Sequence, residues 1–368
     1  MFSFSVCMIA KNESKNIGKC IDSIMPLVKS FEGSEVIVAD TGSTDDTIEI
    51  AKNKGAKVYE YKWTGNFAEA RNYACSKAMN DYVLSVDCDE FLENFSQELA
   101  DRFMKDVLAN EGKIGMSTIV STYVQNGEEL RSRDKIGRFY DRRIYSFFGE
   151  VHENLRAVNE KDENSYFDLP ISFDHVGYDT TELRKSKAER NKKLLLGELK
   201  ENPGDPYVLF QLGKCCVAME EYKEGTDYYE QVMEQKLNPN LSYIQDMMVS
   251  YGYGLMAQKR FADALCLEGV TDLFEENADF MFMLGLIYMN NALFDDAIAA
   301  FLKATKTTAY AVEGVNSYKA YYNIGVIEEV RGNILKAKDF YRKCDEYKPA
   351  KDRLKELDDN RLQKNFKK

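Results

Sequence analysis

The chain lacks the residue patterns of a disulfide-stabilised, zinc-binding or nucleic-acid-binding protein. Eight cysteines are spread along 368 residues without any C-x-x-C spacing, and the two histidines lie far from all of them. This distribution is typical of reduced, mostly buried thiols and argues against a disulfide framework or a zinc site. The net charge of −12 argues against a nucleic-acid partner, because binding phosphates requires a basic face.

Long hydrophobic runs are also missing. No apolar stretch approaches the roughly 20 residues that a membrane helix needs. The run from Phe2 to Ala10 is short, and Lys11 follows it at once, so it does not resemble a signal peptide. We therefore expect a cytoplasmic protein without an integral membrane segment. Its length of 368 residues favours two domains.

Residues 1 to about 125 alternate strand-like and helix-like segments. Apolar, β-branched runs predict strands at 4–10, 35–39, 57–61 and 82–86, and helical spacing predicts helices at 13–26, 43–55 and 67–79. This βαβαβαβ order predicts a mostly parallel sheet covered by helices. Ligands of such sheets bind beyond the carboxyl ends of the strands.

A tetrad of polar residues, Asp87-Cys88-Asp89-Glu90, follows the fourth predicted strand directly. Two aspartates one residue apart at the carboxyl end of a strand can hold Mg²⁺ or Mn²⁺ against a diphosphate, because these ions prefer oxygen ligands. A solvated acidic turn is the alternative, since D-x-D also occurs by chance. Other polar residues fall at the same edge of the predicted sheet: Asn12 and Glu13 after the first strand, and Asp40 after the second.

Beyond residue 205 the pattern changes to helix after helix with an internal repeat. Four glycines precede a small residue by twelve positions, at intervals of 39, 33 and 40 residues. An aromatic residue follows four positions later in three units, and Glu268 takes this place in the remaining one. The repeat resembles the tetratricopeptide repeat, a helical hairpin of about 34 residues that stacks into a solenoid with a concave face. The glycine and small-residue pairs are Gly213 and Gly225, Gly252 and Ala264, Gly285 and Ala297, and Gly325 and Ala337.

Four segments of the first half together resemble family 2 glycosyltransferases. They are Ile9-Ala10-Lys11-Asn12-Glu13, the segment 40–45 (DTGSTD), the segment 66–72 (NFAEARN) and the 87–90 tetrad, in this order. The resemblance covers about residues 1 to 180. It implies a GT-A fold, which is an α/β, Rossmann-like mixed sheet, together with a nucleotide-activated sugar as donor and inversion at the anomeric centre.

The resemblance also implies roles for individual residues. It places Ala10, Asn12, Glu13 and Cys88 near the nucleotide, Asp40 against uracil or ribose, and Asp87 near the ribose. Arg71 would lie close to the phosphates, although a surface helix residue paired with Glu69 or another acid is the alternative. Asp89 would coordinate Mn²⁺ or Mg²⁺ at the diphosphate of a UDP-sugar.

Inversion requires a base beside the acceptor nucleophile. Within Gly149-Glu150-Val151-His152-Glu153, which also resembles a segment of the family, Glu153 is the first candidate and Glu150 the second. His175 is a candidate further metal ligand, or alternatively a structural histidine, and His152 is a weaker candidate. Arg138 and Arg143 face either the diphosphate, the acceptor or local acids. Trp63 either stacks on a sugar or packs in the core.

The expected architecture is a GT-A domain at 1–182, a helical linker at 183–205, tetratricopeptide-like repeats at 206–348 and a charged tail at 349–368. The basic run 184–193 is expected to be a solvated linker helix. This combination is similar to bacterial enzymes that glycosylate bacteriocin peptides, including S-glycosyltransferases of the sublancin type. A peptide or protein acceptor is therefore expected, modified at Cys or Ser and held by the repeats. The alternatives are a polysaccharide or lipid-linked acceptor, or a scaffold with a degenerate nucleotide site. A homodimer is also expected.

Overall fold

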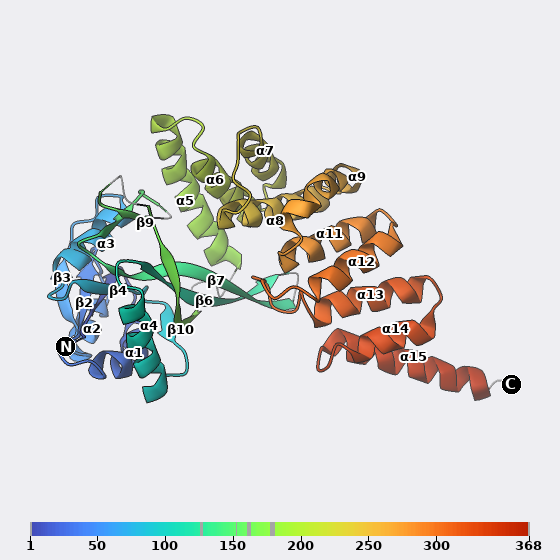
Figure 1. Cartoon of the computed structure of the whole chain (residues 1–368), viewed down its shortest axis with the longest axis horizontal. Helices are drawn as coiled ribbons and strands as arrows, with labels where there is room; N and C mark the ends of the chain where they lie inside the picture. The colour runs from blue at the N-terminus through green and yellow to red at the C-terminus, as the bar shows by residue number, and fades with distance from the viewer. Residues whose placement is uncertain (1, 126–127, 152, 160–162, 177–180, 367–368) are drawn as a thin grey trace. The chain divides into compact units, whose positions relative to one another are not determined.

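A computed structural model describes residues 2–125, 128–151, 153–159, 163–176 and 181–366. The chain divides into two compact units, Met1–Lys187 and Ala188–Lys368. The first contains a sheet covered by helices, and the second contains helices that follow one another along the chain (Figure 1). The expected domain boundaries stay a prediction. The segment expected as a charged tail forms most of helix α15 (Lys348–Phe366).

The sheet of the first unit combines parallel and antiparallel strands. Its order is β3-β2-β1-β4-β7-β6-β10-β5. Strands β3 (Lys57–Glu60), β2 (Glu35–Asp40), β1 (Ser5–Ala10) and β4 (Tyr82–Ser85) are parallel to one another. The remaining strands are β7 (Glu128–Asp141), β6 (Ile114–Gln125), β10 (Tyr166–His175) and β5 (Glu90–Leu92).

The second half of the sheet contains antiparallel pairs, which makes the sheet mixed, as the family resemblance implied. Strand β7 pairs antiparallel with both β4 and β6, and β5 pairs antiparallel with β10. The pattern of the first 125 residues predicts the parallel half well. It could not predict the long β6–β7 hairpin, because side-chain periodicity does not specify which strand becomes the neighbour.

Alternating side chains of β1 face two different cores. Phe4, just before this strand, and Val6 and Met8 within it pack with helices α1 (Ile17–Lys29) and α4 (Gln97–Ala109). Cys7 faces the opposite core, with α3 (Phe67–Ser76) and the hairpin of β8 (Tyr145–Phe148) and β9 (Asn154–Ala157). The period of two in a strand therefore gives one helical layer on each face.

Several predicted helix ends differ from the structure. Helix α1 begins at Ile17, with Asn16 as its N-cap, rather than at residue 13. It also continues past Pro26, because Leu27 and Val28 are buried and extend the apolar face by another turn. Helix α2 (Thr47–Asn53) falls inside its predicted range 43–55, and α3 begins at Phe67 as predicted but ends at Ser76 rather than at residue 79.

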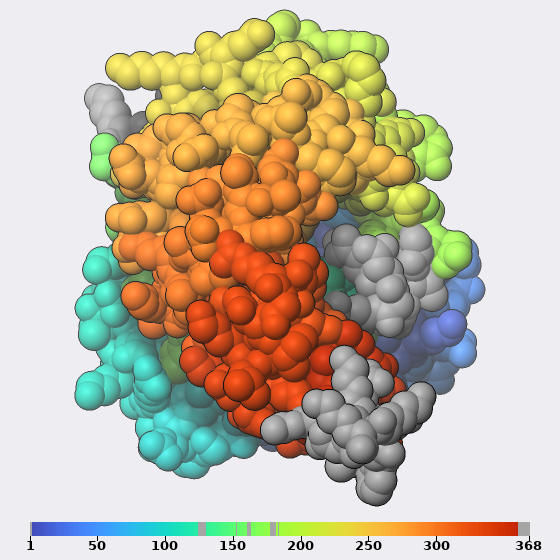
Figure 2. Space-filling view, turned by 90° about the vertical axis from the view of Figure 1, so that its right-hand side faces the viewer, coloured from blue at the N-terminus to red at the C-terminus, as the bar shows by residue number. Residues whose placement is uncertain are grey.

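The second unit begins within α5 (Thr181–Glu201), and its following helices pair as hairpins. The pairs are α6 (Pro206–Ala218) with α7 (Tyr222–Met233), α11 (Ala278–Asn290) with α12 (Phe294–Ala304), and α13 (Tyr318–Val330) with α14 (Ile334–Arg342). From yellow through orange to red, Figure 2 shows the same chain order on one face of this unit.

Glycines of the first helix in each hairpin receive the aromatic ring of the second helix. A Cβ at Gly213 would lie 2.2 Å from a ring carbon of Tyr229, and a Cβ at Gly285 would lie 2.7 Å from Phe301. These distances are shorter than any normal contact, so a side chain at either position would displace the ring. The glycine and the aromatic residue of the repeat pattern are thus two sides of one contact.

The hairpin that carries Glu268 is built differently. Helix α8 (Ser242–Ala257) is followed by the short α9 (Phe261–Ala264), the 3₁₀ helix η1 (Leu265–Val270) and α10 (Thr271–Phe274). Here Met283 and Leu267, rather than an aromatic ring, occupy the space beside Gly252. The exception in the sequence pattern therefore marks the repeat whose second helix is broken.

Within the described parts of the chain, no helix combines the length and the apolar character required to cross a membrane.

Candidate functional site

Two loops at the carboxyl ends of β1 and β2 are joined by hydrogen bonds. The backbone N–H of Asn12 donates to Ser43 Oγ at 2.9 Å, and Asn12 Oδ1 accepts from the backbone N–H of Thr44 at 2.8 Å. The N–H of Glu13 donates to Thr47 Oγ1 at 2.7 Å. Asn12 has a positive φ of 56°, a conformation that asparagine tolerates better than most residues. These contacts hold the sheet edge at which the site lies.

Asp40 closes β2, and only one of its two carboxylate oxygens is hydrogen-bonded to the part of the chain that the structure describes. Its Oδ1 accepts from the backbone N–H groups of Gly42 and Ser43 at 3.0 and 2.9 Å. Its Oδ2 is buried and has no hydrogen-bond partner among the described residues. A buried acceptor without a partner is costly. This oxygen is therefore available to accept a hydrogen bond from a ligand.

Five charged side chains form a continuous series of ion pairs beyond β4, which we call the five-charge series. In order, they are Glu153, Arg71, Asp87, Arg138 and Glu90. Arg71 pairs with Glu153 and, at 2.7 Å, with Asp87 Oδ1. Arg138 pairs with Asp87 Oδ2 at 3.0 Å and with Glu90. Each arginine side chain is at most 8% exposed, so both guanidinium groups are enclosed and each faces two carboxylates.

The surroundings shift the pKa values within this series in opposite directions. Burial alone would raise the pKa of Asp87, but Arg71 and Arg138 hold it well below its ordinary value. Burial is also the main influence on Glu90, whose pKa is raised despite the attraction of Arg138. Asp87 is therefore a fixed anion, with each of its oxygens bound by a different arginine.

Asp89 lies beside His175 at the edge formed by β5 and β10. His175 Nε2 is 3.3 Å from Asp89 Oδ2, and its Nδ1 is 3.1 Å from Ser121 Oγ. Burial acts against the charged forms, but their mutual attraction lowers the pKa of Asp89 and raises that of His175. The ladder pairing of His175 with Glu90 brings the end of β10 to the tetrad.

The donor set of Asp89 and His175 fits Mg²⁺ or Mn²⁺. Such ions are commonly held by one or two protein carboxylates, with substrate phosphates and water completing the shell. A hydrogen bond from Nδ1 to Ser121 would leave Nε2 as the ligand nitrogen. Histidines that bind metals usually make such a hydrogen bond with their second ring nitrogen. Asp87 is a poorer candidate for a metal ligand, because each of its two carboxylate oxygens is already paired with an arginine.

The other candidates near this edge have less direct positions. Ala10 is buried, and its carbonyl accepts from the N–H of Thr41 at 2.9 Å. Cys88 is buried with its thiol 3.3 Å from the Ile9 carbonyl, and burial raises its pKa, which indicates a packing role. Trp63 is half-buried against Phe67, with ring centroids 4.8 Å apart.

The two glutamates proposed as base differ in placement. Glu153 lies in the site through its ion pair with Arg71, and its side chain is 11% exposed. The side chain of Glu150 is exposed, and its backbone carbonyl accepts from the N–H of Phe67 at 2.9 Å. The structure thus brings Glu153, but not the carboxylate of Glu150, into the five-charge series. His152 lies outside the described residues.

Arg143 is at the opposite end of the sheet. It pairs with Asp81 at 2.9 Å and with Asp141 at 2.6 Å, and its side chain is 62% exposed. Asp141 is opposite Tyr82, the first residue of β4, whereas the site follows the last residue of that strand. The expectation that Arg143 faces a diphosphate or acceptor is therefore corrected: it faces local acids.

Sequence reasoning missed four residues of the site. Glu90 accepts from the N–H of Asp87 at 3.0 Å and so shapes the tetrad turn. Ser85 Oγ accepts from Arg71 at 3.2 Å, and Ser121 supports His175. Lys187 Nζ lies 3.8 Å from Asp89 Oδ2. The position of Glu90 within the tetrad was a usable signal, whereas nothing local to Ser121 or Lys187 indicates proximity to Asp89.

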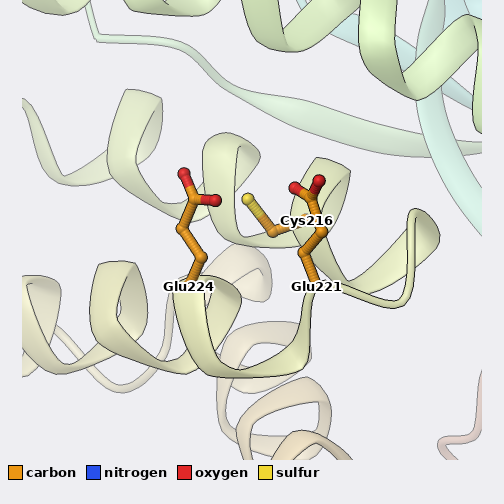
Figure 3. A group of neighbouring side chains, drawn as sticks. All are labelled: Cys216, Glu221 and Glu224. Atoms are coloured by element: carbon orange, nitrogen blue, oxygen red, sulfur yellow. The ribbon is translucent and has the colours of Figure 1, made fainter.

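A second group of possible metal donors occurs in the second unit. Cys216, Glu221 and Glu224 place their donor atoms close together (Figure 3). The ammonium of Lys192 lies 2.7 Å from Glu221 and 2.8 Å from Glu224. A protein cation thus already neutralises these carboxylates, and the group is best understood as a link between α5 and the first hairpin.

Comparisons with known proteins agree with both parts of the fold. Residues 5–147 match the model of glycosyl transferase family 2, and residues 278–309 and 318–351 match the tetratricopeptide repeat. The mixed, GT-A-like sheet therefore contains the segment that matches family 2 glycosyltransferases, and a helical region with tetratricopeptide-repeat matches follows it. The expected fold class is confirmed.

Two curated relatives are similar in sequence to this chain over a stretch that includes parts of both regions. The SPbeta prophage-derived glycosyltransferase SunS of Bacillus subtilis is 28% identical over 66% of this chain and 56% of its own length. A TPR repeat-containing protein of Synechococcus elongatus is 29% identical over 64% of this chain and 57% of its own length. The chain thus spans a little over half the length of these relatives.

Solved structures give weaker likenesses. A glucosyl-3-phosphoglycerate synthase from Mycobacterium tuberculosis in complex with Mn²⁺, UDP and phosphoglyceric acid is 30% identical over 34% of this chain and 44% of its own, with a TM-score of 0.27. YrrB, a TPR protein with an unusual peptide-binding site, is 23% identical over 46% of this chain and 83% of its own, with a TM-score of 0.38. At these TM-scores neither likeness supports a conclusion about fold or ligand.

Proposed function

We propose that this chain is a metal-dependent, inverting glycosyltransferase that moves a sugar from a UDP-sugar to a peptide or protein acceptor. The observation that carries this proposal is the pairing of two features at one sheet edge. Asp40 presents a buried oxygen without a partner among the described residues, and Asp89 lies beside an imidazole that suits a metal ion. Their chemistry fits the two ends of a nucleoside diphosphate.

The nucleoside end would lie at Asp40. Uracil and ribose both carry hydrogen-bond donors, and Asp40 Oδ2 is an acceptor that either of them could use. Asn12 and Glu13 belong to the loop joined to the segment after β2, so they are positioned to limit the nucleoside's orientation. Asp87 is fixed by two arginines and would face the ribose.

The diphosphate end would lie at Asp89 and His175, which would hold Mn²⁺ or Mg²⁺. When bound, such an ion offsets negative charge that develops on the departing diphosphate. The chain's own residues fix the ligands in advance: Ser121 orients His175, and the backbone bond from Val176 to the Asp89 carbonyl at 3.1 Å ties the two segments together.

Glu153 is our candidate for the base. Inversion requires a group that takes the proton of the acceptor nucleophile as that nucleophile bonds to the anomeric carbon. The Glu153 carboxylate is enclosed and held by Arg71, so its position is well defined. Glu150 remains the second candidate, because its exposed side chain could turn toward a bound acceptor.

The helical repeats support a peptide or protein acceptor. Stacked helical hairpins form extended surfaces suited to peptide segments. The resemblance to bacteriocin-glycosylating enzymes favours a Cys or Ser side chain as nucleophile. A polysaccharide or lipid-linked acceptor is the alternative. The homodimer and the cytoplasmic location stay predictions.

Donor binding tests the proposal directly. We expect UDP to bind the full chain in calorimetry with Mn²⁺ and to lose most of its affinity when EDTA is added. A panel of UDP-sugars, followed by release of UDP, would then identify the sugar. If UDP and every UDP-sugar fail to bind with either ion, the enzyme interpretation is wrong and a scaffold with a degenerate site is favoured.

A further inference from the structure

We propose that Lys187, on α5, is a direct ligand of the donor's diphosphate. This inference rests on the proposed function and adds to it a residue from outside the strand-end motifs. Lys187 Nζ lies 3.8 Å from Asp89 Oδ2, and its side chain is 31% exposed. The ammonium therefore stands beside the carboxylate assigned to the metal, at the end of a side chain that is partly exposed.

Lys187 is held to Asp89 by a long ion pair on a partly exposed side chain, so its ammonium can shift toward a phosphate oxygen. At 3.8 Å the pair with Asp89 is an ion pair longer than a normal hydrogen bond. A lysine ammonium carries three donors on a flexible stem. A phosphate oxygen placed at the metal beside Asp89 would be within the range of movement of this side chain.

The arginines of the site cannot supply the same charge. Arg71 already faces Asp87 and Glu153, and Arg138 already faces Asp87 and Glu90. Both are enclosed, with side chains 8% and 6% exposed. Binding a diphosphate adds negative charge next to the Asp89 carboxylate, and further charge develops there as the nucleoside diphosphate leaves. Lys187 is the partly exposed cation at this point of the described site.

The preceding turn of α5 supports the same assignment. Arg184 and Lys187 are three residues apart, so they share a face of the helix. The Arg184 guanidinium lies 5.9 Å from the ring centroid of Tyr123, near the strand that supplies Ser121. Its Nε is buried without a hydrogen-bond partner among the described residues. This helix face thus carries a second cation that lies against β6, the strand that supplies Ser121.

The test compares UDP with uridine, which lacks both phosphates. In the full chain with Mn²⁺, Lys187→Met is expected to weaken UDP binding by about tenfold or more, because a charge-assisted hydrogen bond to phosphate is lost. Uridine binding, followed by ligand-observed NMR, is expected to stay within about twofold, since the lost contact is to phosphate alone. Lys187→Arg is expected to retain most of the UDP affinity.

Lys193→Met is the matched control, because it removes the same charge from the same helix. Lys193 is 73% exposed and pairs with Glu189. UDP affinity in this control is expected to equal that of the unmodified chain. If Lys187→Met binds UDP normally, or loses UDP and uridine binding equally, Lys187 is a structural residue and the inference is wrong. If the unmodified chain binds neither uridine nor UDP, the proposed function itself fails.

Discussion

The two units of this chain fill their interiors in different ways. Around the site of the first unit, the interior contains charge: Arg71, Arg138 and Glu90 are buried and linked through Asp87. The hairpins of the second unit contain rings packed on bare backbone, as at Gly285 and Phe301.

This difference separates residues kept for chemistry from residues kept for shape. Burying a pair of charges costs desolvation energy that its attraction often only offsets, so buried ion pairs are a weak means of gaining stability. Ring-on-glycine contacts gain packing without that cost. The buried, mutually paired charges of the five-charge series are therefore better explained by the chemistry of the proposed site than by stability, whereas Arg143, at the other end of the sheet, is 62% exposed.

The largest effect is expected from Arg138→Met. This change leaves Asp87 with one arginine and takes from Glu90 the cation that it pairs with, and removing one partner of a buried pair typically costs about 3–5 kcal/mol. Urea unfolding followed by Trp63 fluorescence would measure it, because the single tryptophan reports on the first unit. Lys135→Met is the control, because Lys135 is 55% exposed and its partner Asp168 is 69% exposed, and it should cost less than about 1 kcal/mol, as for exposed pairs. Equal costs would contradict the contrast between buried and exposed charge.

A smaller effect, on activity rather than folding, is expected from Asp89→Asn. The amide keeps the shape but loses the charge that would hold the metal, so turnover of the donor is expected to fall about 100-fold, near 2.7 kcal/mol. The urea midpoint should change little. Asp168→Asn is the control, since Asp168 is 69% exposed and pairs with Lys135. Full activity in Asp89→Asn would show that Asp89 is not the metal ligand.

Glycine substitutions test the second unit. Gly285→Ala places a Cβ 2.7 Å from Phe301, and such overpacking is expected to cost about 2 kcal/mol. Gly197→Ala, in α5, meets nothing within 4 Å and is expected to stabilise by roughly 0.5–1 kcal/mol through helix propensity. Helical circular dichroism during urea unfolding distinguishes the two. If both variants changed the free energy of unfolding in the same direction, the contact with the Phe301 ring would not be the reason for the glycine at position 285.

The smallest expected effect is a pH-dependent loss of stability in a Glu35 variant. Burial would raise the pKa of Glu35, but the Lys57 ammonium, the Met79 N–H and the Ser5 hydroxyl together lower it. A lowered carboxyl pKa contributes stability above its unfolded value of about 4.3, and this stability is lost as the pH falls through the folded value. Glu35→Gln is therefore expected to cost about 1 kcal/mol at pH 7 and less at pH 3. A cost that does not shrink in acid would contradict the assignment.

Much of the fold and part of the site could be predicted from the sequence. Alternation and helical spacing predicted the first four parallel strands, and the glycine, small-residue and aromatic register predicted the hairpins. Because ligands of parallel sheets bind at the carboxyl ends of the strands, the order of residues alone was enough to assign Asp40, Asp87 and Asp89 to one edge of the sheet.

The rest depended on long-range pairing. Arg138 and Arg143 are five residues apart, yet antiparallel pairing of β7 with β4 places Arg138 near Ser85 and leaves Arg143 near the start of that strand. Lys187 and Ser121 reach Asp89 and His175 from elements distant in sequence. Periodicity describes each element alone and does not specify these encounters.

The five-charge series also constrains how this protein can diverge over generations. Each internal member, from Arg71 through Asp87 to Arg138, contacts two neighbours of opposite sign. Mutations at contacting residues have non-additive effects on the free energy of unfolding, so replacing one member changes how much its neighbour contributes to stability. Among descendants of this chain, the five positions are expected to be inherited as a block, with substitutions tolerated only when a neighbour changes too.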